Sequence, residues 1–195
     1  MNNLANTTKL IENIIQNNYK GNNSNIIDII IDAAEIKGDE LIVEIGSGIG
    51  SLTEYLLKSI KHGKIIAIEK DNRFIKILKE QFEDEVKNEK LKLVNDDVLN
   101  IKWNKFLKNY DKKVKVLANL PYYITTPVIM GLLESNYKFD SLIFMVQKEV
   151  AERMVADPGT KAFGSLSVAV QYHTKDKIIH QVPSSVFLPS PEVQS

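Results

Sequence analysis

The stretch NLPYYITTPVI, residues 119–129, places an amide, a proline and two tyrosines directly after a run of strand-forming residues. The Asn119 side-chain oxygen and the Leu120 carbonyl are hydrogen-bond acceptors, and Pro121 restrains the backbone beside them without adding a donor. Two acceptors that engage both N–H groups of an adenine amine favour a pyramidal nitrogen, whose lone pair can attack an electrophile. Tyr122 can stack on a base drawn out of its helix. The stretch predicts chemistry at an adenine amine; the alternative is an N-capped turn whose tyrosines pack in the core.

A second group of candidates lies in EIGSGIG, residues 44–50, between an apolar run and a helical stretch. Its glycines allow a tight turn and a close approach of the backbone to a ligand. The helix N-terminus that follows can receive a negative group. The dinucleotide fingerprint is absent, because Ser51 stands where its last glycine would be. The candidate cofactor-binding residues here are Glu44, Gly46, Gly48 and Gly50, and the alternative is a plain turn between strand and helix.

Acidic residues follow the next two apolar runs. Glu69 ends the second run and can accept both hydroxyl protons of a ribose. Asp97, in NDDVL, can accept a proton from an adenine amine, and the Val98 amide can meet the adenine ring nitrogen. Taken alone, Asp97 is better explained by a solvated loop, and a charged residue such as Glu69 commonly ends a strand. Together with the glycine turn they predict a cofactor that contains adenosine.

The adenosine-containing cofactor must be a methyl donor if the acceptors around Asn119 are to have a function. A nicotinamide cofactor would leave those acceptors without one. S-adenosylmethionine (SAM) requires no strong base, since the departing thioether is neutral and the proton leaves after attack. The chain has no cysteine, and its three histidines show no metal-ligand spacing. We therefore expect SAM as the cofactor and no metal.

The elements that must position these residues alternate between strand and helix. We predict strands at residues 41–45, 64–69, 91–94, 114–119, 141–147 and 177–182. We predict helices at residues 7–19, 24–36, 51–60, 72–86, 103–108, 127–134, 149–155 and 165–172. This alternation predicts an α/β fold, a mostly parallel twisted sheet with helices on both faces. Right-handed crossovers then place the carboxyl ends of the strands, and all the candidates that follow them, at one edge.

The composition is that of an ordinary globular domain, with 195 residues, 44% of them apolar and 26% charged. No apolar run is long enough to span a membrane, and the first residues lack a signal-peptide pattern. We expect a monomeric, cytoplasmic protein without membrane contact. The net charge of zero argues against a polyanion-binding field over the whole surface but allows a local basic face.

Six motifs together resemble one family. They are VEIGSGIGSLT, AIEKD, NDDVL, NLPYYITTPVI, QKEVAERMVADPGTKAFGSLSVAVQY and FLPSPEVQS, and the likeness covers residues 22–195. The sequence is similar to the bacterial ribosomal RNA small-subunit adenine dimethyltransferases. The large-subunit enzymes of the macrolide-resistance type share the first motifs, but residues 147–172 resemble the small-subunit group.

The resemblance implies a class I SAM-dependent (Rossmann-like) fold and dimethylation of N6 on two adjacent adenosines near the 3′ end of 16S rRNA, in the small ribosomal subunit. Gly46 would lie against the amino-acid end of SAM, Glu69 would bind its ribose and Asp97 its adenine amine. Asn119 would lie between cofactor and substrate, and Phe187 would cover the face of the target adenine opposite Tyr122.

Basic residues that are candidates for RNA binding are Lys148, Arg153 and Lys161, with Lys102 and Lys105 as further possibilities. Ordinary solvated lysines are the alternative for each. For Lys112, Lys113 and Lys115 we expect an exposed, solubilising turn.

The sequence departs from the family in two places. The family carries a G-Q-N-F-L segment before its first motif, and residues 19–23 have none. The family also continues, past the position that matches Ser195, into a last antiparallel strand and a small helical domain. We therefore expect that strand to be missing and the strand at 177–182 to lack that antiparallel neighbour. The expected units are N-terminal helices in residues 1–36 and a SAM-binding catalytic domain in residues 37–195.

Two other functions stay open on the sequence alone. The first is a truncated, non-catalytic module that binds SAM or rRNA during ribosome assembly. The second is a large-subunit rRNA adenine N6-methylase of the macrolide-resistance type. A nicotinamide dehydrogenase is disfavoured by Ser51 and by the NLPY motif.

Overall fold

The sheet is the element that brings the candidate residues together. The computed structural model describes residues 8–12, 24–111, 113–120, 122–135 and 137–182. Seven strands form one sheet in the order β4-β3-β2-β5-β6-β1-β7, and every neighbouring pair is parallel. The strands are β1 (Thr8–Glu12), β2 (Leu41–Ile45), β3 (Lys64–Glu69), β4 (Leu91–Asn95), β5 (Val114–Asn119), β6 (Ser141–Met145) and β7 (Thr174–Ile178). The predicted α/β class is confirmed.

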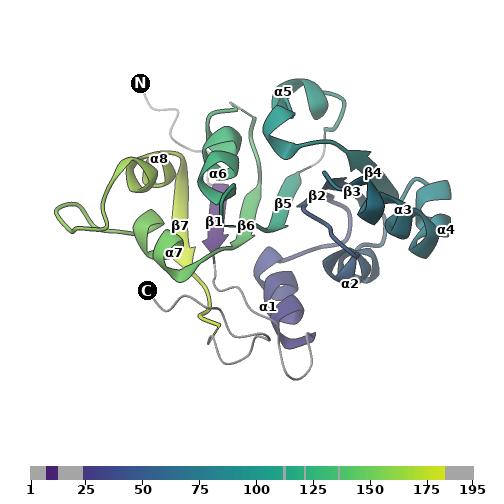
Figure 1. The fold of residues 1–195 in the computed structure, drawn as a ribbon, viewed down its shortest axis with the longest axis horizontal. Coiled ribbons are helices and arrows are strands. Elements are labelled where there is room, and N and C mark those ends of the chain that lie inside the picture. Colours follow the sequence, from purple (N-terminus) through teal and green to yellow (C-terminus); the bar gives the residue numbers. More distant parts are fainter. Residues whose placement is uncertain (1–7, 13–23, 112, 121, 136, 183–195) are drawn as a thin grey trace.

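Helices cover both faces of this sheet. They are α1 (Ser24–Ala34), α2 (Ser51–Ser59), α3 (Asn72–Gln81), α4 (Glu83–Lys87), α5 (Trp103–Phe106), α6 (Thr125–Leu133), α7 (Lys148–Met154) and α8 (Ser165–His173), with a 3₁₀ turn η1 (Val98–Asn100). In Figure 1, α1 and α2 lie on one side of the sheet, and α5, α6 and α8 lie on the other. In the described part of the chain, no helix has the length and apolar character needed to span a membrane.

Strand β2 shows why the sequence reads as apolar runs. Ile42 packs with α1, α2 and α3 on one face, whereas Val43 packs with α5, α6 and α8 on the other. Both side chains are completely buried. A parallel strand with helices on both faces needs apolar residues at successive positions, so a continuous run replaces alternation.

Strand β1 corrects the prediction for the N-terminal region. A helix was predicted at residues 7–19, but Thr8–Glu12 form a strand between β6 and β7; residues 1–7 and 13–23 lie outside the described part. Two neighbouring strand edges supply backbone partners on both sides, and this tertiary pairing overrides the local helical pattern. Strand β1, from the region expected to be helical, thus lies in the same sheet as the strands that follow residue 36.

Strand β7 was predicted as a strand, but its bounds differ from the prediction. It covers Thr174–Ile178 rather than residues 177–182, and it begins directly after α8 ends at His173. Its neighbour is β1, which pairs with it in parallel from Thr8↔Thr174 to Glu12↔Ile178, rather than the antiparallel strand that the family would place there.

Lys115 on β5 links the C-terminal end of α1 to the sheet through hydrogen bonds. Its buried Nζ donates to the Ala34 carbonyl (2.7 Å) and the Glu35 carbonyl (3.3 Å), and it lies 3.4 Å from Asp140 Oδ2 and 3.9 Å from Glu40 Oε1. Burial acts to raise the pKa of Glu40, but backbone N–H donors and the Lys115 charge lower it more. The prediction that Lys115 solubilises an exposed turn was wrong.

Candidate cofactor and substrate site

The glycine turn after β2 has the backbone conformation that its sequence suggests. Gly46 and Gly48 have φ values of +76° and +53°, in the left-handed region that glycine tolerates. The Gly46 N–H donates to the Ile68 carbonyl (2.9 Å), and the Gly48 N–H donates to Glu69 Oε2 (2.9 Å). A Cβ placed on Gly48 would meet no atom within 4 Å, so the turn borders open space at the sheet edge.

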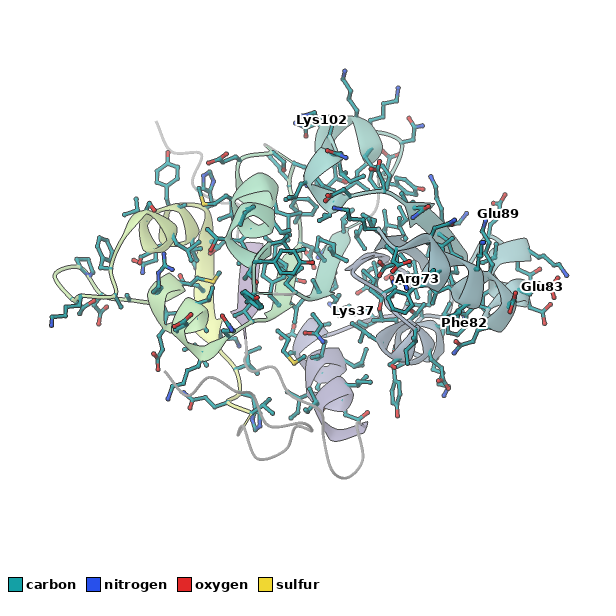
Figure 2. The ribbon with its side chains drawn as sticks, in the orientation of Figure 1. Lys37, Arg73, Phe82, Glu83, Glu89 and Lys102 are labelled. Atoms are coloured by element: carbon teal, nitrogen blue, oxygen red, sulfur yellow. The ribbon has the colours of Figure 1, made fainter. Side chains whose placement is uncertain are left out.

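Gly50 serves packing rather than an approach to a ligand. It precedes α2 with a φ of +89° and is buried. A Cβ at this position would lie 2.7 Å from Phe82 Cε2 and 2.8 Å from Leu78 Cδ2. Phe82, labelled in Figure 2, is the C-cap residue of α3, so Gly50 allows α2 and the end of α3 to pack closely.

Glu69, at the end of β3, is 9% exposed and held by backbone donors. Its Oε2 accepts from Gly48 N–H and its Oε1 from Asp71 N–H (2.8 Å). The Asn95 amide donates to the carbonyls of Glu69 and Lys70, both at 3.0 Å, and so ties the end of β4 to that of β3. Each carboxylate oxygen keeps a free lone pair, which leaves capacity for two hydroxyl donors.

Asp97 lies after β4, beside Glu69's strand. Its Oδ1 accepts from Leu99 N–H (3.0 Å), and its Oδ2 pairs with Lys70 Nζ (2.8 Å). The hydrogen bond from Lys70 holds the pKa of this carboxyl below its usual value, so Asp97 is ionised at neutral pH. Val98 is buried at the start of η1. Asp97 is thus a hydrogen-bond acceptor at the same sheet edge as Glu69.

Glu44 lies beneath the glycine turn and is 2% exposed. Its Oε2 accepts a 2.6 Å hydrogen bond from Thr53 Oγ1 in the first turn of α2. Burial raises the pKa of Glu44 to about 7. A carboxyl group of the protein itself therefore lies at the first turn of α2.

The NLPYY stretch begins at the end of β5, next to β2. Asn119 is exposed and is paired in register with Met145 of β6, and the Leu120 N–H donates to the Met145 carbonyl (3.2 Å). A Cβ on Gly46 would lie 3.7 Å from the Asn119 carbonyl oxygen. The turn that carries the two predicted acceptors thus lies against the glycine turn. Pro121 and Phe187 fall outside the described residues.

The two tyrosines of this stretch point into solvent. Tyr122 is 60% exposed and Tyr123 is 70% exposed, and their rings meet edge to face at 5.7 Å. The exposure of Tyr122 agrees with a ring available for stacking. The alternative, an N-capped turn whose tyrosines pack in the core, is therefore wrong for both rings.

The basic candidates fall into separate groups. Lys148 and Arg153 are exposed on α7, with Lys148 Nζ 3.6 Å from Glu152, and Lys161 is exposed on the loop that follows. Lys102, labelled in Figure 2, and Lys105 lie at α5, which Figure 1 shows well apart from α7. The structure therefore does not join them into one basic patch.

Sequence reasoning missed Lys70 at this edge. Its ion pair with Asp97 links the ends of β3 and β4, and the Asp97 hydrogen bond raises the pKa of Lys70. The sequence could have indicated this role for Lys70, because Lys70 directly follows Glu69 at the end of a predicted strand.

Solved structures share this fold. The 23S rRNA methyltransferase ErmE superposes with a TM-score of 0.69 at 23% identity, covering 90% of this chain and 66% of that one. A dimethyladenosine transferase from Plasmodium falciparum superposes with a TM-score of 0.64 at 35% identity. The superposition covers 76% of this chain and 50% of that one. The fold is the one that class I SAM-dependent methyltransferases adopt.

Sequence relatives narrow this class to one family. The family model "Ribosomal RNA adenine dimethylase" matches residues 15–195, and the chain belongs to this family. A "Ribosomal RNA small subunit methyltransferase A" from Halothermothrix orenii is 50% identical over 174 residues, which are 88% of this chain and 56% of that protein. A protein of the same name from Alkaliphilus metalliredigens is 46% identical over 173 residues, which cover 88% of this chain and 58% of that protein. The motif-based resemblance is confirmed, and the chain spans less than two thirds of these curated relatives.

Proposed function

We propose that this protein transfers methyl groups from SAM to N6 of two adjacent adenosines near the 3′ end of 16S rRNA, in the small ribosomal subunit. Family membership and the small-subunit names of the relatives support the substrate. The observation that carries the proposal is the contact between the Asn119 turn and the Gly46 turn. It brings the predicted adenine acceptors beside the predicted cofactor residues, as methyl transfer requires.

The residues at the sheet edge fit SAM. Gly48 leaves open space beside the turn, and Glu69 has capacity for two ribose hydroxyls. Asp97 is ionised and one strand further along, where it would accept from the cofactor's adenine amine, with the Val98 amide meeting the ring. When bound, SAM would supply an electrophilic methyl group.

The chain itself would contribute orientation. The Asn119 side-chain oxygen and the Leu120 carbonyl accept hydrogen bonds from the two N–H groups of the target adenine, which localises the nitrogen lone pair. Tyr122, exposed beside them, stacks on the extruded base and limits its tilt. Pro121 would restrain this turn and Phe187 would cover the second face of the base. Lys148, Arg153 and Lys161 would neutralise rRNA phosphates.

Radiolabelled SAM with immature small subunits tests the proposal, and we expect label in the rRNA. Asn119→Ala should lose most of that label while still binding S-adenosylhomocysteine (SAH), the demethylated product. If the unchanged chain binds SAH but transfers no label, it is a binding module rather than an enzyme. If it binds neither SAM nor SAH at millimolar concentration in calorimetry, the cofactor assignment is wrong.

A further inference from the structure

The two tyrosines after β5 lie on a short link whose ends are fixed. At one end, Leu120 is buried and donates its N–H to the Met145 carbonyl (3.2 Å). At the other end, Thr125 is buried and begins α6. Between these two anchors, Tyr122 and Tyr123 extend into solvent. Both ends of the link are therefore held, and the orientation of each ring depends on what its side chain contacts.

The aromatic contact of Tyr122 is with Tyr123. Their ring centroids lie 5.7 Å apart with an interplanar angle of 86°. Among the residues that the structure describes, no hydrogen bond reaches either side chain, and Tyr122 has no second aromatic neighbour. Edge-to-face contacts of this kind stabilise a ring pair beyond the area that they bury. Tyr123 therefore restrains the orientation of the Tyr122 ring.

The orientation of Tyr122 matters for the reaction because a stacked base takes the plane of the ring on which it lies. A base that tilts with the ring moves its N6 amine away from the acceptors of the Asn119 turn. Methyl transfer needs the reacting atoms in near-attack geometry, so a small misplacement lowers the rate. A side chain as exposed as Tyr122 moves between rotamers unless a neighbour restrains it.

We propose that Tyr123 is a positioning residue for methyl transfer, whose ring holds Tyr122 in one orientation and so fixes the plane on which the target adenine stacks. This inference rests on the proposed function. In this role Tyr123 contacts neither the cofactor nor the reacting atoms. Its effect on the reaction passes through Tyr122, which distinguishes it from a ring that stacks on RNA directly.

A double-mutant cycle tests this dependence. The single-turnover rate of methylation of immature small subunits is measured for the unchanged chain, Tyr123→Leu, Tyr122→Ala and the double variant. We expect Tyr123→Leu to lower the rate about three- to tenfold, as the loss of an edge-to-face contact implies. In the Tyr122→Ala background the same substitution should have no further effect, because the ring that it orients is gone. An equal loss in both backgrounds, or no loss in either, overturns the proposal.

Two matched variants separate the Tyr123 ring from its other features. Tyr123→Phe keeps the ring and removes only the hydroxyl, so we expect a rate within about twofold of the unchanged chain. Tyr172→Leu removes a ring of similar exposure, 69%, which lies just before β7 and therefore at the opposite edge of the parallel sheet. This variant should leave the rate unchanged. A loss as large as that of Tyr123→Leu in either variant overturns the proposal.

A measurement without substrate separates this inference from the proposed function. In the cofactor-free chain we expect NMR cross-relaxation between the Tyr122 and Tyr123 rings, and a lower order parameter for the Tyr122 ring in Tyr123→Leu. The absence of either signal overturns the inference even if the chain methylates rRNA. If both signals are present and the unchanged chain transfers no label, the proposed function is wrong, and the positioning role is overturned with it.

Discussion

At the scale of single residues, the site depends on acceptors held by the backbone. Glu69 fixes the glycine turn through one oxygen and the start of α3 through the other. Asp97 likewise accepts from the first turn of η1. Such carboxylates are oriented before any ligand arrives, which reduces the cost of binding.

Asn119 should affect catalysis more than binding. Asn119→Ala removes one of the two acceptors proposed for the target amine, and we expect the turnover rate to fall by about 10²–10³. Affinity for SAH should change much less, because Glu69 and Asp97 are intact. Single-turnover methylation and calorimetry measure the two quantities, and an equal loss in both would show that Asn119 acts mainly through the cofactor.

Glu44 predicts a pH dependence of stability. Its pKa is raised from 4.5 to about 7 in the folded protein. Its stabilising contribution is therefore complete below pH 4.5 and is lost as the pH rises through 7, by about 3 kcal/mol at most. Denaturant unfolding without cofactor at pH 5 and pH 8 should show this loss in the unchanged chain. The loss should be absent from Glu44→Gln, and an identical loss in the variant would assign it to other groups.

At the scale of elements, one glycine allows α2 to approach α3. Gly50→Ala places a Cβ against Phe82 and Leu78 at a φ of +89°, and we expect a loss of about 2–4 kcal/mol in the free energy of unfolding. Gly159 has a φ of +88° and no atom within 4 Å of its Cβ position. Gly159→Ala therefore costs only the backbone strain, about 1 kcal/mol. Similar losses in both variants would remove the packing argument.

The attachment of α1 depends on the buried lysine of β5. Lys115→Met leaves the buried carboxylate of Glu40 without its nearest cation, and we expect a loss of about 3 kcal/mol. Lys113→Met removes only an exposed ion pair with Asp140 (3.3 Å) and should cost less than about 1 kcal/mol. Thermal or denaturant unfolding of the two variants tests the difference, and equal effects would contradict it.

Local sequence patterns predicted the strands that can be recognised without knowing which strands they pair with. The runs at β2, β3 and β5 are apolar because both faces are covered, and the candidates that follow them could be placed at one edge by topology alone. Strand β1 could not be predicted, because it exists through pairing with β6 and β7, far away in the sequence. The burial of Lys115 and the exposure of Tyr123 also depend on packing that no local pattern records.

At the scale of the whole molecule, one parallel sheet gathers four loops at its carboxyl edge. The turns after β2, β3, β4 and β5 carry the glycines, Glu69, Asp97 and Asn119. Because these strands are neighbours in the order β4-β3-β2-β5, the predicted cofactor would lie across three of them and the target base beside the fourth. This arrangement predicts which atom of the substrate is methylated.

Mapping the label in rRNA identifies that atom. Small subunits that lack the modification are incubated with the protein and labelled SAM, and the nucleosides of each rRNA are separated and placed in the sequence by mass spectrometry. We predict N6,N6-dimethyladenosine at two adjacent positions near the 3′ end of 16S rRNA, and far less of it with Asn119→Ala under the same conditions. Label on 23S rRNA, or on an atom other than adenine N6, would contradict the proposed methylation of 16S rRNA.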